Sequence, residues 1–112
     1  LAKKSRMMFE EDVHFSPEAQ EELQKLSEMV MEASGRSLEA LDQNNKEIAA
    51  EAVELCRAVK RFQKEIRKNH ISRLGERKCE PIAGFVMLEL LINMKRIADH
   101  SKNIAQLVQG TF

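Results

Sequence analysis

The chain has 112 residues, and its 18 Lys and Arg are balanced by 18 Asp and Glu, so the formal net charge is zero. This length suits one domain, and a hydrophobic content of 43% excludes general disorder. The neutral balance argues against a dedicated nucleic-acid binder. The chain lacks Trp and Tyr and has only four Gly and two Pro, a composition that disfavours β-sandwiches and barrels and predicts an all-α fold.

The sequence contains no stretch that predicts a membrane span or a secretory signal. Glu89 interrupts the apolar stretch at residues 85–92, far short of the roughly 20 apolar residues that cross a bilayer. The basic residues near the N-terminus are followed by three apolar residues and then by acids, unlike a signal peptide. Because the first residue is Leu rather than Met, we expect the chain to be part of a longer protein.

The two cysteines, Cys56 and Cys79, show no metal-ligand spacing. If Cys56 lies in a helix that ends before Cys79, the two are separated by roughly 28 Å, too far for a disulfide. We therefore predict two free thiols in a reducing compartment, with Cys56 in the core.

The first predicted helix begins at Ser16 and Pro17, where Ser16 is placed to cap the helix and Pro17 suits its first position. The polar residues 42–45 are predicted to end it in a turn. The predicted apolar face consists of Ala19, Leu23, Leu26, Val30, Leu38 and Leu41.

Two further helices are predicted from apolar residues that alternate at spacings of three and four, as in helices packed lengthwise. Gly75 is predicted to end the second helix. Its predicted seam is Ile48, Ala52, Leu55, Val59, Phe62 and Ile66. The third seam, after Pro81, is Ala83, Met87, Leu90, Met94, Ile97, Ser101, Ile104 and Val108. This seam is widened by flanking Val86, Leu91, Ala98 and Ala105, so the third helix is expected to be the most buried.

Short connections force neighbouring helices to be antiparallel. We therefore predict an up-down-up three-helix bundle over residues 16–109, preceded by a lead-in over residues 1–15. Residues 10–54 are mainly acidic and residues 57–78 mainly basic, so the first hairpin is expected to pair opposite charges. The expected acids are Glu18, Glu21, Glu22, Glu28 and Glu32, and the expected bases are Lys60, Arg61, Lys64, Arg67 and Lys68. A basic patch for phosphate, nucleotide or an anionic membrane surface is the alternative interpretation.

Residues with catalytic potential are scarce. The sequence has no glycine-rich phosphate loop, no zinc-protease motif, and no nucleophile beside a base at helical spacing. Of the three histidines, His14, His70 and His100, those at helix interfaces are expected to be structural. Pairs of acids four residues apart could hold a metal if they faced inward, but solvated faces are the favoured interpretation. These pairs are Glu18 with Glu22, Glu28 with Glu32, and Glu47 with Glu51.

Three motifs in order resemble those of PhoU-like proteins. NMKRIADHSKNIA at residues 93–105 resembles the family's N-L-E-R-I-G/A-D-H-x-x-N-I-A helix. HISRL at residues 70–74, followed by CEP at 79–81 and Gly84, is similar to a passage of the PhoU-like domains of bacterial sodium/phosphate cotransporters. FSPEA at residues 15–19, with Glu22 and Leu23, resembles the opening of those domains.

The resemblance implies a PhoU-like bundle on the cytoplasmic side of the cell membrane, joined to the membrane-embedded part of a sodium/phosphate cotransporter. Free-standing PhoU proteins have two bundles in tandem, whereas this chain has the length for one. We expect a non-catalytic regulatory or assembly domain with no cofactor, an indirect relation to phosphate, and a second copy as a possible partner. The alternatives are a soluble PhoU-like regulator of phosphate signalling and a metal-binding carboxylate bundle.

The resemblance also points to one candidate metal ligand, Asp99. Some family members bind clustered metal ions through an acid four residues before this position, where the present chain has Lys95. By the same alignment, Lys60 occupies a position on the second helix that is commonly Asp. Each lysine places a cation where a metal would need an oxygen ligand, and Lys95 is expected to pair with Asp99 instead.

Overall fold

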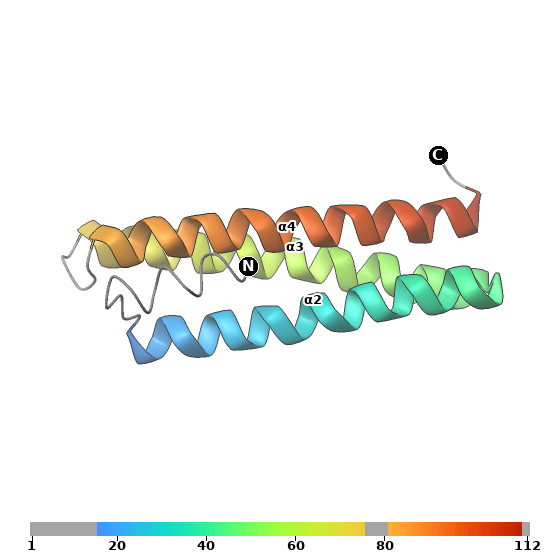
Figure 1. Cartoon of the computed structure of the whole chain (residues 1–112), viewed down its shortest axis with the longest axis horizontal. Coiled ribbons are helices and arrows are strands. Elements are labelled where there is room, and N and C mark those ends of the chain that lie inside the picture. The colour runs from blue at the N-terminus through green and yellow to red at the C-terminus, as the bar shows by residue number, and fades with distance from the viewer. Residues whose placement is uncertain (1–15, 76–80, 111–112) are drawn as a thin grey trace.

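The computed structural model describes residues 16–75 and 81–110, which form three long helices lying side by side (Figure 1). These are α2 (Pro17–Gln43), α3 (Lys46–Gly75) and α4 (Pro81–Gln109). Successive helices run in opposite directions, so the predicted all-α, up-down-up bundle is confirmed. The lead-in at residues 1–15 lies outside the described residues, and the domain boundary at residue 16 stays a prediction.

The start of α2 follows from its first two residues. Ser16 has an extended backbone, and its hydroxyl accepts a hydrogen bond from the backbone N–H of Ala19 at 3.2 Å. Pro17 follows as the first helical residue, where its missing N–H costs nothing. The predicted N-cap is confirmed.

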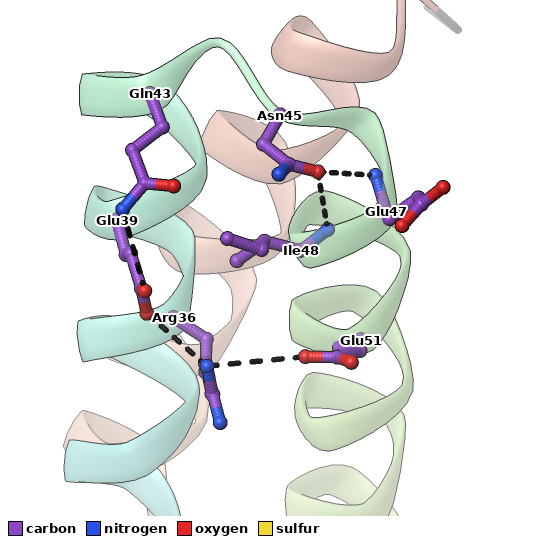
Figure 2. A network of polar contacts seen from close by, with 7 residues as sticks. All are labelled: Arg36, Glu39, Gln43, Asn45, Glu47, Ile48 and Glu51. Atoms are coloured by element: carbon purple, nitrogen blue, oxygen red, sulfur yellow. Dashed lines mark hydrogen bonds and ion pairs between the residues drawn. The ribbon is translucent and has the colours of Figure 1, made fainter.

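The turn between α2 and α3 is made by two asparagines and is shorter than predicted, since residues 42 and 43 are still helical. Asn44 has a left-handed backbone with φ 49°, which asparagine tolerates better than most residues. The Asn45 side-chain oxygen accepts hydrogen bonds from the backbone N–H groups of Glu47 at 2.9 Å and Ile48 at 3.1 Å (Figure 2). One asparagine therefore ends α2 and the next caps α3.

The core changes character along the bundle. The larger cluster contains bulky side chains from all three helices, among them Leu26, Ile66 and Met87. The smaller cluster, near the asparagine turn, is built mainly from small residues, namely Ala40, Ala49, Ala52, Val53, Ala105 and Val108. Small side chains allow helix backbones to approach closely, so the helices pack tightly at that end.

The predicted apolar faces are partly wrong in register. On α2, Leu38 and Leu41 are 55% and 48% exposed, whereas Ser37 and Ala40 are buried. On α3 and α4, Ile48, Leu55 and Phe62 are only half-buried and Ile97 is exposed, whereas Ala49 and Gln63, outside the predicted seam, are buried. The predicted core positions that hold are Cys56 on α3 and Val86, Leu91, Ala98 and Ala105 on α4. Each helix packs against two others, so its buried stripe is wider than one seam and centres on small residues. A prediction from hydrophobicity alone places the larger side chains at the centre of the buried stripe, although they lie at its edges.

The opposite charges of the first hairpin meet, but the predicted acid Glu22 pairs with Arg73 and not with any of the predicted bases. Glu22 accepts from Arg73 at 2.6 Å and from Asn69 at 3.2 Å. A second contact joins Arg36 to Glu51 at 4.0 Å. Among the described residues, none of the predicted acid–base pairs forms. Lys60 instead contacts Asp99 of α4, and Arg67 lines a crevice with Leu88 and Ile92 of α4. Within the described ranges, no helix is both long and apolar enough to cross a membrane.

The observed register of α2 predicts that replacing two of its leucines by alanine lowers the free energy of unfolding by different amounts. Leu26 is fully buried, so Leu26→Ala is expected to lower the free energy of unfolding by about 3 kcal/mol through lost burial and a cavity. Leu38→Ala, at an exposed position of the same helix, is expected to cost less than about 0.5 kcal/mol. Urea denaturation monitored by circular dichroism measures both values, and equal losses would contradict the register.

Candidate functional site

A polar cluster lies where the middles of the three helices meet, and the predicted ligand Asp99 is part of it. The Asp99 carboxylate on α4 is 2.9 Å from the Lys60 ammonium on α3. About one third of each side chain is exposed. The two residues that the family resemblance assigned to a metal site on different helices are therefore in direct contact.

Asp99 and Lys60 form an ion pair without a well-aligned hydrogen bond. Asp99 Oδ1 has no solvent contact and no hydrogen bond of good geometry, although Lys60 Nζ lies beside it. The bound carboxylate is the main reason that the pKa of Lys60 is raised above its usual value, against a smaller opposing effect of burial. Lys60 therefore remains a permanent cation at this position.

The expected pair between Lys95 and Asp99 does not form, and this prediction is wrong. Lys95 is exposed and makes no contact with Asp99, whose Oδ1 is enclosed beside Lys60 of α3. An interfacial carboxylate gains more from a cation on the neighbouring helix than from one held in water, because the local dielectric is lower. Lys60 is that cation.

Below this ion pair, the cluster continues into the core through Ser37, Cys56 and Ser101, all buried. The Ser37 hydroxyl on α2 donates a hydrogen bond of 2.8 Å to the backbone carbonyl of Ser101 on α4. Burial raises the pKa of the Cys56 thiol, an effect that the nearby Lys102 charge partly opposes. Cys56 is thus a neutral core thiol, as predicted; Cys79 lies outside the described residues.

The side chains around Asp99 fit a metal ion poorly. Within residues 16–75 and 81–110, no three His, Cys, Asp or Glu side chains are grouped so that they could hold one. The acid pairs noted in the sequence are mostly exposed, and Glu22 is engaged by Arg73. At Asp99 the balancing positive charge already comes from Lys60. The assignment of Asp99 as a metal ligand stays a prediction.

His70 is buried, only 2% exposed, where the end of α3 meets the start of α4. Its Nε2 lies 3.2 Å from the Gly84 carbonyl oxygen, which can only accept, so Nε2 carries the proton. Nδ1 is buried without a hydrogen-bond partner. His70 is therefore structural, as expected, and joins α3 to α4. His100 is exposed, and His14 lies outside the described residues.

A shallow groove of about 720 Å³ runs between α2 and α3 near the asparagine turn. Figure 2 shows part of its wall, where Arg36 lies between Glu39 of its own helix, at 3.2 Å, and Glu51 of α3. The lining residues are Glu32, Arg36, Ala50, Glu51, Glu54, Leu55 and Arg61. Its opposite charges largely neutralise one another, so the groove offers no strong field to an ionic ligand.

The antiparallel three-helix bundle, with a lysine–aspartate contact between its second and third helices, defines the chain as a helical-bundle domain. The family model of the PhoU domain matches residues 23–108, and the chain belongs to this family. No curated protein and no solved structure gives a significant match.

Sequence reasoning named Lys60 and Asp99 but did not predict their contact. Their positions in the family motif could have predicted this contact, because residues that share one metal site must lie close together, here on the second and third helices. The bond between Ser37 and Ser101 has no such signal, because the two residues are 64 positions apart. It depends on the register between α2 and α4.

Protonation of His70 is expected to weaken the bundle. Burial is the main reason that the pKa of His70 is lowered below its usual value of 6.5, and the Arg73 charge adds to this effect. The Gly84 carbonyl and Glu22 oppose it. Because the folded state binds the proton less well than the unfolded state, stability is complete above about pH 6.5 and falls as the pH decreases below it.

Urea denaturation between about pH 7.5 and 5.5 measures this dependence. His70→Gln, which can still donate to Gly84, is expected to remove most of the loss of stability in this range. His100→Gln, at an exposed histidine, is the matched control and is expected to keep it. An unchanged pH profile in His70→Gln would assign the titration to another group.

Replacing the two lysines by acids is expected to create a metal site at Asp99. In the double variant Lys60→Asp with Lys95→Glu, the carboxylates can bridge a divalent cation. We expect this variant to bind Mn²⁺ in isothermal titration calorimetry and the natural chain to show no stoichiometric binding. Lys25→Asp with Lys46→Glu gives the same net charge at distant positions and is expected not to bind. Tight binding by the natural chain would show that Lys60 does not block the site.

Proposed function

We propose that this chain is a non-catalytic regulatory or assembly domain of a sodium-dependent phosphate cotransporter. The observation that carries the proposal is the PhoU domain match over residues 23–108. The PhoU family suggests a role in the regulation of phosphate transport. The motifs at residues 15–19, 70–74 and 79–84, which resemble cotransporter-linked domains, support the tethered form.

The chemistry of the described residues supports regulation by contact rather than by catalysis. Cys56 is buried and held neutral, so it is a poor nucleophile. His70 has Nε2 committed to Gly84 and its other nitrogen enclosed. Lys60 and Asp99 neutralise each other. The outer faces of the helices remain for partners, and we propose the membrane-embedded part of the same transporter, on the cytoplasmic side, as the main one.

Deletion of this domain from the full-length protein tests the proposal. In a strain without other phosphate transporters, the deletion variant is expected to retain sodium-dependent uptake of radiolabelled phosphate, because the domain does not form the transport path. We expect the variant to lose the decrease in uptake that follows phosphate loading of the cells. Quantification of the transporter in isolated membranes controls for expression.

Two results would contradict the tethered form. One is a complete reading frame without hydrophobic segments that could span a membrane. The other is uptake whose response to phosphate is unchanged by the deletion at equal transporter levels. A second tandem bundle in the full-length sequence would favour the alternative, a free-standing PhoU-like regulator of phosphate signalling.

A further inference from the structure

The surface shared by α3 and α4 combines exposed basic and exposed apolar side chains. Ile71, Phe85 and Ile92 are 52%, 60% and 47% exposed. We call this surface the basic–apolar face. It consists of Lys64, Arg67 and Ile71 on α3 and of Phe85, Ile92 and Lys95 on α4.

The register of the two helices brings these residues onto one surface. Arg67 of α3 and Ile92 of α4 line the same small crevice, together with Leu88. Lys64 and Ile71 lie three and four residues from Arg67 and share its flank of α3; Phe85 and Lys95 are similarly spaced about Leu88 and Ile92. The contact between Lys60 and Asp99 continues this edge of the bundle.

The charge of the face is positive, although the chain as a whole is neutral. Lys64, Arg67 and Lys95 are exposed and, within the described ranges, form no ion pair. Of the acids nearby, Asp99 is matched by Lys60, and Glu89, which lies four residues after Phe85 and three before Ile92, is half-buried and already has an interaction partner. The positive field is therefore directed outward.

The shape of the face favours a flat partner. Its crevice has a volume of about 120 Å³, well below the roughly 300 Å³ of the smallest usual ligand pockets. The apolar side chains Ile71, Phe85 and Ile92 are spread along the antiparallel helices α3 and α4. Large apolar side chains beside Lys and Arg are the composition with which helices lie on an anionic membrane surface.

We propose that the basic–apolar face binds the surface of a bilayer that contains anionic phospholipids. Lys64, Arg67 and Lys95 contact headgroup phosphates, while Phe85, Ile71 and Ile92 enter the boundary between headgroups and acyl chains. The long axis of the bundle then lies parallel to the membrane. This surface does not depend on the proposed tether to a transporter, because it is present in the isolated chain.

Sedimentation of the 112-residue chain with vesicles tests this proposal. Vesicles of phosphatidylcholine with about 30% phosphatidylglycerol are expected to bind the chain, and vesicles of phosphatidylcholine alone are not. Binding is expected to fall as the salt concentration rises, because the charges are exposed. In the double variant Lys64→Glu with Lys95→Glu, the apparent affinity is expected to decrease about 30-fold or more.

Two variants separate the lipid contact from general effects. Lys25→Glu with Lys46→Glu changes the net charge equally but away from the face, and is expected to bind within about twofold of the natural chain. Phe85→Ser keeps the charge and is expected to weaken binding about tenfold, since an apolar side chain no longer enters the interface. Circular dichroism shows whether each variant retains its helices.

Several results would overturn the proposal. One is equal binding of the natural chain to neutral and anionic vesicles. Another is an equal loss of affinity in the Lys64/Lys95 and Lys25/Lys46 double variants. A third is full binding both by Phe85→Ser and by the Lys64/Lys95 double variant. Failure of the folded natural chain to bind anionic vesicles would also overturn it, and an acidic protein surface would then become the preferred partner. The uptake experiment can succeed whatever the vesicles show, so the two proposals fail separately.

Discussion

Each helix buries one stripe of apolar and small side chains against the other two, and this shared burial is the constraint on which the other features depend. Helices of 27 to 30 residues are about 40–45 Å long, so the stripe must keep its direction over seven or eight turns. Spacings of three and four keep it there. The stripe then fixes the register, which brings Lys60 to Asp99, Ser37 to Ser101 and His70 to Gly84.

The helix limits could be predicted because they depend on local chemistry. Ser16 and Pro17 begin α2, and the asparagines at 44 and 45 separate it from α3 through their own side chains and backbone. The centre of each buried stripe could not be predicted so well. A helix between two neighbours has a wide buried face, and its middle takes small residues such as Ala40, which hydrophobicity ranks below Leu38 and Leu41.

At the candidate site, too, the residues could be predicted from the sequence but their packing could not. The family motif identified Asp99 and Lys60, but their pairing required the register of α3 against α4. The charged pairs of the first hairpin were assigned to the wrong residues for a related reason: composition shows that opposite charges can meet, whereas the flank that each side chain occupies decides which do. The Lys60 ammonium supplies the positive charge beside Asp99.

The two-residue turn between α2 and α3 has a consequence for the entropic cost of folding. Residues that meet across this turn, such as Ala40 and Ala49, are close in sequence, so bringing them together closes only a small loop and costs little entropy. Contacts between α2 and α4, such as Ser37 with Ser101, span 64 residues. The hairpin of α2 and α3 therefore closes at a lower entropic cost than the pairing of α2 with α4. The asparagine turn thus lowers the cost of bringing two helices together as well as setting where the chain reverses.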